Sequence, residues 1–184
     1  MKFTPAPLDG VFVIEPELLE DDRGFFARAF CANEFAEAGL CSTYVQHNIA
    51  WNRQPNTLRG LHMQFPPHSE VKVVTCLRGR VFDVIIDLRP RSPTFMQHLG
   101  IELSGESRSR LYVPEGFVHG YQTLTPDTEL LYLHSRFFAP GDEFGVRWDD
   151  PAFAVQWPLA DPKLSQRDRT LPDFDRAAFL ERGG

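Results

Sequence analysis

The stretch TLRGLHMQFPPHSEVKVVTCLRGRVFDVIIDLRP (residues 57–90) decides the fold, because three of its segments have the composition of β-strands. LRGLHMQF, EVKVVTCL and RVFDVIIDL are rich in β-branched and other apolar residues, and proline and glycine punctuate the stretch. Its apolar positions are interrupted by the cations Arg59, Lys72 and Arg78 and by His62. These residues are either satisfied core and edge residues, or they face a cavity that receives an anion.

Strand-like segments recur along the rest of the chain at the spacing typical of an all-β sandwich or barrel. They are VQHNIAW, QHLGIELS, SRLYVPEG, GYQTLT and TELLYLHSRFF. Helical patterns are confined to CANEFAEAGL, a turn near DPKLSQRD and the C-terminal DFDRAAFLERG. The sequence therefore predicts one all-β domain over residues 1–184, a jelly roll with short peripheral helices. We expect an N-terminal arm over about residues 1–30, whose segment GVFVIEPELL could pair with a partner's sheet or with its own, and a helical tail over about residues 160–184.

Composition excludes several classes of protein. A net charge of −6 disfavours a broad nucleic-acid-binding face, although a small anionic ligand needs only a few local cations. No apolar run is long enough to cross a bilayer, and MKFTPAPLDGVF lacks the apolar stretch of a signal peptide. Cys31, Cys41 and Cys76 show no metal-ligand spacing. They indicate reduced thiols in a cytoplasmic protein.

Two histidines raise the question of a metal site. Strand alternation places His62 beside Gln64 and on the face opposite Arg59. The segment LYVPEGFVHGYQTL adds His119 in the turn-then-histidine pattern that ends a cupin-type jelly roll. A metal-binding cupin supplies His-x-His, a glutamate and a last histidine, but here Gln64 holds the second position and Glu70 is the nearest carboxylate downstream. This set is a poor one for a transition metal, so we expect neither a metal nor another cofactor.

Eight motifs, in order, resemble those of the dTDP-4-dehydrorhamnose 3,5-epimerase family, a metal-free branch of the cupins. They are DDRGFF, VQHN, TLRGLHMQFPP, EVKVVTCLRGRVFDVIIDLRPRSPTF, LYVPEGFVHGYQTL, LLYLHS, EFGVRWDDP with the following VQWP, and LSQRD. Family members invert the carbons beside the ketone, C3 and C5, of a nucleotide-linked 4-keto-6-deoxyhexose. The resemblance implies a cofactor-independent isomerase that converts dTDP-4-dehydro-6-deoxy-D-glucose to dTDP-4-dehydro-L-rhamnose. It also implies a homodimer in which the N-terminal arm adds to the neighbour's sheet.

This chemistry needs a base, an acid across the sugar ring and a cation near the ketone oxygen. By the resemblance, His62 is the base and Asp168 of LSQRD fixes its tautomer. Tyr132 matches the acid, and Lys72 matches the cation. Without the resemblance, Asp168 is a helix cap or turn residue, Tyr132 is a core residue and Lys72 is an edge-strand lysine.

The resemblance also implies a set of substrate-binding residues. Arg23 and Arg59 match residues that contact the diphosphate and nucleotide, for which a planar guanidinium is well suited. The other matching positions are Gln46, Asn48, His119, Glu143 and Arg167. For Glu143 and Arg167, an ordinary surface charge is an equally good interpretation.

Two departures from the family pattern leave parts of the assignment open. Arg28 stands where the family has a glutamate that helps hold the nucleotide, so the substrate could carry dTDP, CDP or GDP. Phe138 replaces a common tyrosine, and inversion at only one carbon stays open. A metal-dependent cupin isomerase or oxygenase is a second hypothesis, which Gln64 disfavours. A non-catalytic nucleotide-sugar-binding module is a third, and the joint presence of the four catalytic candidates disfavours it.

Overall fold

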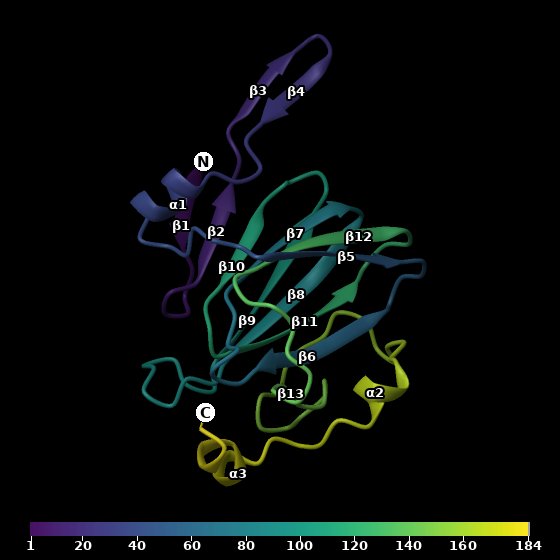
Figure 1. The fold of residues 1–184 in the computed structure, drawn as a ribbon. Helices are drawn as coiled ribbons and strands as arrows, with labels where there is room; N and C mark the ends of the chain where they lie inside the picture. Colours follow the sequence, from purple (N-terminus) through teal and green to yellow (C-terminus); the bar gives the residue numbers. More distant parts are fainter. Residues whose placement is uncertain (184) are drawn as a thin grey trace.

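Two antiparallel β-sheets face each other in the computed structural model, which describes residues 1–183 (Figure 1). In spatial order, the six-stranded sheet consists of β1 (Lys2–Pro5), β2 (Phe12–Glu15), β10 (Arg110–Val113), β7 (Lys72–Arg78), β12 (Thr128–His134) and β5 (Gln46–Asn52). The five-stranded sheet consists of β13 (Glu143–Gly145), β6 (Leu58–Gln64), β11 (Phe117–Thr123), β8 (Arg80–Asp87) and β9 (His98–Ser104). This arrangement confirms the predicted all-β jelly roll.

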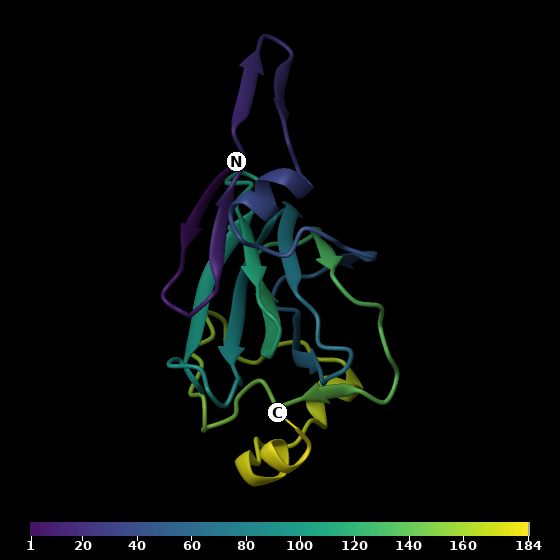
Figure 2. The same ribbon diagram turned by 60° about the vertical axis from the view of Figure 1, so that its left-hand side comes forward.

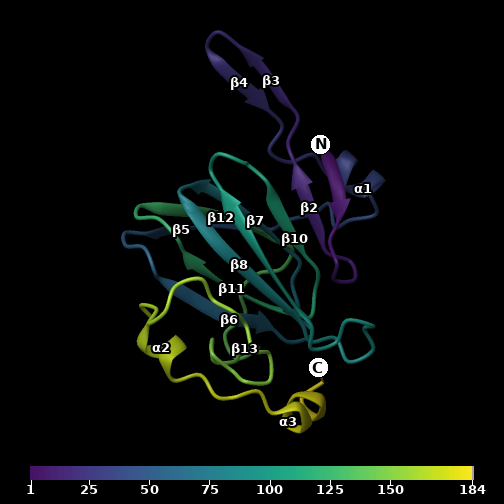
Figure 3. The same ribbon diagram turned by 180° about the vertical axis from the view of Figure 1, so that it is seen from behind.

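Short helices lie at the periphery of the sandwich, as the sequence predicts. They are α1 (Ala32–Glu37), α2 (Gln166–Arg169) and α3 (Arg176–Glu181). Figure 3 shows α1 beside β1 and β2, while α2 and α3 lie near β6 and β13 at the other end of the molecule. The helices therefore leave the space between the two sheets open for other side chains.

Strand alternation separates an inner core from two outer ones. On β12, Leu130 and Tyr132 point between the sheets, whereas Leu131 and Leu133 pack on the outer face with Phe35 of α1. The outer face of the five-stranded sheet is covered by C-terminal residues, among them Phe153 and Phe179, and the cluster includes Leu61, Met63, Val84, Ile86 and Val118. Because both outer faces are covered, every central strand buries apolar residues on two sides.

The N-terminal region is only partly separate from the sandwich. β2 pairs with β1 and β10 of its own chain, so this part of GVFVIEPELL lies in its own sheet. β3 (Leu18–Asp21) and β4 (Gly24–Ala27) form a hairpin that projects away from both sheets (Figure 2). Three of its apolar side chains, Leu19, Phe25 and Phe26, are 62%, 46% and 74% exposed.

Simple alternation fails at one place in β6. His62 is paired with His119 of β11, but the next paired residues are Arg59 and Tyr121, three positions away on one strand and two on the other. This register shift brings Arg59 to the same face as His62 and corrects the expectation that the two residues face apart. At this shift the backbones of β6 and β11 approach each other closely. A Cβ added at Gly60 would lie 2.5 Å from the Cα of Gly120.

Gly60 and Gly24 form a matched pair for testing this close approach. Their φ angles are +126° and +127°, but no atom lies within 4 Å of a Cβ added at Gly24. We expect Gly60→Ala to lower the free energy of unfolding more than Gly24→Ala, by about 1–3 kcal/mol, because only the former forces the backbones of β6 and β11 apart. Denaturant unfolding at a fixed protein concentration measures both losses. Equal losses in the two variants would contradict the proposed backbone clash.

Candidate active site

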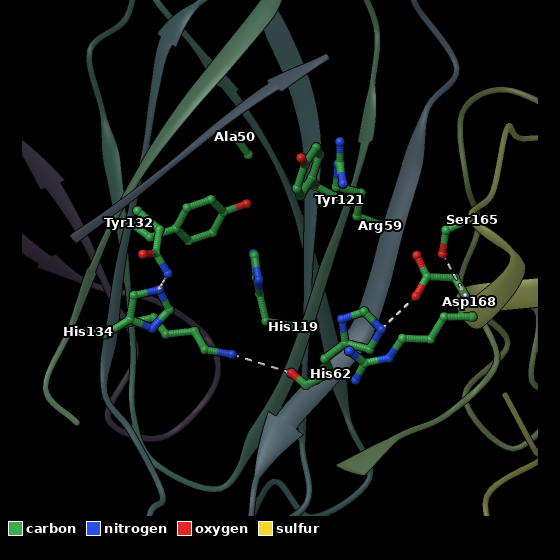
Figure 4. Close-up of a pocket in the computed structure, with 12 residues that line it drawn as sticks. Ala50, Arg59, His62, His119, Tyr121, Tyr132, His134, Ser165 and Asp168 are labelled. Atoms are coloured by element: carbon green, nitrogen blue, oxygen red, sulfur yellow. Dashed lines mark hydrogen bonds and ion pairs between the residues drawn. The ribbon is translucent and has the colours of Figure 1, made fainter. Parts of the chain in front are cut away.

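A cavity of about 360 Å³ lies between the two sheets near α2 (Figure 4). One wall comes from the six-stranded sheet, through residues of β5, β7 and β12, and the other comes from β6 and β11. Its lining residues are Asn48, Ala50, Arg59, His62, Lys72, His119, Tyr121, Tyr132, His134, Ser165, Arg167 and Asp168. The structure thus brings eight of the eleven predicted site residues into one space.

His62 and Asp168 form a hydrogen-bonded pair in one wall. The Nε2 atom of His62 lies 2.7 Å from Oδ1 of Asp168, whose side chain is only 5% exposed. Ser165 caps α2 by accepting a hydrogen bond from the backbone N–H of Asp168, so the Asp168 carboxylate is not used as a helix cap. Burial opposes ionisation of Asp168, but hydrogen bonds from His62 and Ser165 outweigh it and hold its pKa below the ordinary value. With its Nε2–H donated to this carboxylate, neutral His62 has Nδ1 as its basic atom.

Tyr132 stands across the cavity from His62 (Figure 4). Its ring is stacked on His134, with centroids 5.8 Å apart, and meets the His119 ring edge-on at 5.9 Å. Burial raises the pKa of Tyr132 well above 10, and the neighbouring Tyr121 and Asp83 raise it further. The Tyr132 phenol is therefore protonated at neutral pH.

Lys72 lines the cavity from β7, in the wall formed by the six-stranded sheet. β7 is flanked by β10 and β12, so the edge-strand interpretation of this lysine is wrong. The Nζ atom lies 3.1 Å from Oε1 of Glu70, and both side chains are at most 10% exposed. Lys72 also donates a hydrogen bond of 3.4 Å to the carbonyl oxygen of His62. The ammonium is thus paired while it stays in the cavity lining.

A smaller cavity of about 170 Å³ adjoins the first and shares Asn48, His62, Lys72 and His134 with it. This cavity holds the predicted Gln46 and Glu143, together with Phe138, whose backbone N–H donates to Gln46. Glu143 is 2.7 Å from Arg167 of the main cavity. The two cavities are therefore lined by one connected set of polar residues.

Arg23 is the predicted residue that the structure does not bring to the cavity. It lies in the turn of the β3–β4 hairpin, where its side chain is 90% exposed and paired with Asp21 at 2.5 Å. Because this hairpin projects away from the sandwich (Figure 1), Arg23 cannot contact a ligand in the cavity of its own chain.

Sequence reasoning did not identify Asp83, Tyr121 or His134 as site residues. Asp83 is fully buried and lies 2.9 Å from Nε2 of His119, which is itself only 6% exposed. A signal was available, since an acidic residue within RVFDVIIDL shares a face with apolar neighbours and must have a partner. Tyr121 and His134 likewise follow His119 and Tyr132 by two positions on the same strands.

Residues 1–183 lack two features. No three His, Cys, Asp or Glu side chains of this region are grouped so that they could hold a metal ion. Likewise, no helix formed by these residues is both long enough and apolar enough to span a membrane.

His134 provides a test of the electrostatics of the cavity. Burial lowers its pKa to about 4, and Lys72, His119 and His47 lower it in the same direction. Its Nε2 lies 3.3 Å from the Asn48 amide nitrogen, which donates to it. Neutral His134 is thus required for this hydrogen bond.

We expect His134 to make the protein less stable as the pH falls from about 6.5 to about 4. In that range the unfolded chain binds a proton that the folded protein excludes, whereas above it neither state is protonated. His134→Phe keeps an aromatic ring against Tyr132 and should reduce the loss of unfolding free energy by about 1–3 kcal/mol. Denaturant unfolding at several pH values measures this difference, and His98→Phe on the exposed β9 position is the control. Identical pH dependence in His134→Phe and the wild type would contradict it.

Comparisons with known proteins identify the family of the chain. The sequence profile of the dTDP-4-dehydrorhamnose 3,5-epimerase family matches residues 5–176. The chain is 39% identical over 173 residues to the dTDP-4-dehydrorhamnose 3,5-epimerase of Salmonella typhimurium, a match that covers 93% of this chain and 94% of that protein.

Solved structures of similar proteins have the same fold. The dTDP-4-dehydrorhamnose 3,5-epimerase of Bacillus anthracis, with TDP and pyrophosphate bound, superposes with a TM-score of 0.92 at 36% identity, over 94% of this chain and 99% of that one. The epimerase of Legionella pneumophila in complex with dTDP-4-keto-L-rhamnose superposes with a TM-score of 0.87 at 34% identity, over 95% and 98% of the two chains. The profile match and these identities show that the chain belongs to the dTDP-4-dehydrorhamnose 3,5-epimerase family.

Proposed function

We propose that this protein inverts C3 and C5 of dTDP-4-dehydro-6-deoxy-D-glucose and so forms dTDP-4-dehydro-L-rhamnose. One observation carries the proposal: an imidazole held by a carboxylate and a protonated phenol stand on opposite walls of one cavity. Inversion requires this arrangement, because the proton must leave one face of the sugar ring and return to the other. The family assignment supports the same reaction.

His62 begins the reaction as the general base. Its Nδ1 accepts the proton of the carbon beside the ketone, and the C–H electron pair becomes an enolate. The Asp168 carboxylate, 2.7 Å from Nε2, stabilises the imidazolium that forms. Lys72 donates a hydrogen bond to the enolate oxygen.

Tyr132 completes the inversion from the opposite wall. Its O–H bond breaks, a new C–H bond forms on the other face of the ring, and a phenolate remains. Loss of the His62 proton to water and return of a proton to Tyr132 reset the site. Repetition at the second carbon then gives inversion at both positions.

The remaining cations are proposed to bind the diphosphate. Arg59 and Arg167 both line the main cavity, and guanidinium groups bind phosphate oxygens in pairs. Arg28, which departs from the family pattern, forms an ion pair with Glu34 of its own chain. We therefore assign no nucleotide contact to Arg28.

Solvent exchange tests this function directly. In heavy water and with a chelator present, we expect wild-type protein to incorporate deuterium at C3 and C5 of the dTDP-linked 4-keto-6-deoxy sugar. His62→Ala should lose exchange by at least about a hundredfold, because the base is missing. Tyr132→Phe should retain exchange but lose inversion, and His98→Ala, exposed on β9, should behave as the wild type. NMR counts the exchanged carbons, and CDP- and GDP-linked sugars are tested in parallel.

Other outcomes would change the assignment. Exchange at one carbon would make the protein a single-site epimerase, and a requirement for added metal would indicate a metal-dependent cupin. Binding of the nucleotide sugar without exchange would indicate a binding module.

We also propose that the protein is a homodimer in which the β3–β4 hairpin reaches the partner's cavity and delivers Arg23 to the nucleotide. The exposed apolar residues of the hairpin, such as Phe26 at 74%, support burial against another chain. On the other side of the sandwich, edge strand β5 exposes Ile49 and Trp51 at 64% and 50%. An unpaired strand edge with such residues suits pairing with a second copy.

The whole chain is proposed to act as one catalytic domain in the cytoplasm. The family profile, which matches residues 5–176, supports a single domain. Three free cysteines support a reducing compartment.

Mixing two impaired variants tests whether Arg23 acts in the partner's cavity. Arg23→Ala and His62→Ala should each be impaired alone, and refolding them together should restore up to about a quarter of the wild-type sites. The restored site combines His62 of one protomer with Arg23 of the other. If Arg23 serves its own chain, the mixture gains no activity, and an equilibrium ultracentrifugation mass of one chain would exclude the dimer.

A further inference from the structure

Tyr121 has no role in the reaction proposed above, yet it lies in the same cavity. It is 2% exposed, and it shares an inward-facing side of β11 with His119, two residues earlier. Its hydroxyl donates a hydrogen bond of 3.2 Å to Oδ1 of Asn52, which is also 2% exposed. The phenol therefore makes a polar contact here that an apolar ring could not make.

The Tyr132 hydroxyl needs a hydrogen-bond donor during the reaction. Once Tyr132 has given its proton to carbon, a phenolate remains between His119 and His134, where burial opposes the charge. Lys72 is not free to be the donor to this phenolate. Its ammonium is paired with Glu70 at 3.1 Å and, in the proposed reaction, stabilises the enolate oxygen. In Figure 4 the Tyr132 oxygen points toward Tyr121.

Tyr121 can exchange its hydrogen-bond acceptor at a small cost in free energy, because Asn52 has a second donor. Oδ1 of Asn52 accepts two hydrogen bonds, one from the Tyr121 hydroxyl and one of 2.9 Å from Nε of Arg59. If the Tyr121 O–H turns away, the amide oxygen still has Arg59 as a donor and is not left unsatisfied. A hydroxyl can make this turn by rotating about its C–O bond.

We propose that Tyr121 stabilises Tyr132 after Tyr132 has acted as the general acid. The Tyr121 hydroxyl turns away from Asn52 and donates a hydrogen bond to the Tyr132 phenolate. The proposal rests on the epimerase function above. No bond to Tyr121 is broken in this step: Tyr132 loses its proton to carbon, Tyr121 keeps its own, and water later reprotonates Tyr132. Tyr121 thus stabilises the charge that inversion creates, and it takes no part in proton removal by His62.

The pKa of Tyr121 reflects both its burial and its charged surroundings. Burial raises it, whereas the Arg59 charge and the hydrogen bond with Asn52 oppose the rise. Tyr121 is thus a phenol with a polar and partly cationic environment, and one well placed to donate to an adjacent anion.

Tyr121→Phe tests the proposal, because it removes only the hydroxyl and keeps the ring. In heavy water we expect inversion at C3 and C5 to slow by roughly tenfold to a hundredfold. Deuterium exchange with retention of configuration should continue at close to the wild-type rate, since His62 is untouched. KM should change by less than about threefold. The ratio of inversion to exchange therefore falls, which a general structural defect would not cause.

Tyr112→Phe is the matched control. Tyr112 is 6% exposed on β10, and its hydroxyl accepts a hydrogen bond from the backbone N–H of Cys41, outside the cavity. This variant should keep the wild-type ratio. The ratio is unchanged if exchange and inversion fall equally in Tyr121→Phe, or if neither falls. Either result would overturn the inference while leaving the epimerase function intact. Absence of both exchange and inversion in the wild type would overturn the function itself, and the inference with it.

Discussion

Charged side chains can lie between the two sheets only as pairs, because an unpaired charge loses its hydration without compensation. Within residues 1–183, no buried side-chain nitrogen or oxygen lacks a hydrogen-bond partner. Three ionisable pairs at the cavity are Lys72–Glu70 at 3.1 Å, His119–Asp83 at 2.9 Å and His62–Asp168 at 2.7 Å. This requirement explains why an apolar jelly roll contains so many polar residues at one end of its core.

Pairing and burial set the protonation states of His62 and Tyr132. A carboxylate on Nε2 makes Nδ1 the basic atom of His62, while burial keeps the Tyr132 phenol protonated. His62 comes from β6 and Tyr132 from β12, so the spacing of the two sheets sets the distance between the imidazole and the phenol. This spacing matters in the proposed mechanism, because base and acid must act on opposite faces of one bound molecule.

Departures from the family pattern lie at the edge of this machinery. Arg28 is paired with Glu34 near the base of the hairpin. Phe138 lines the smaller cavity and contributes its backbone N–H to Gln46. Neither residue is a member of the pairs Lys72–Glu70, His119–Asp83 and His62–Asp168, so these pairs are intact despite both departures.

The sequence by itself determined the strands, because alternating apolar residues are a property of short segments. The candidates His62, Lys72, Tyr132 and Asp168 came from motifs that resemble those of the family, whereas their residue types alone fit ordinary structural roles. Only the tertiary structure decided which residues meet. The register shift of β6 against β11, the pairing of β2 within its own sheet and the inward partners Asp83 and Tyr121 all depend on strands that are distant along the chain. No local pattern specifies such neighbours, since packing across the sheets selects them.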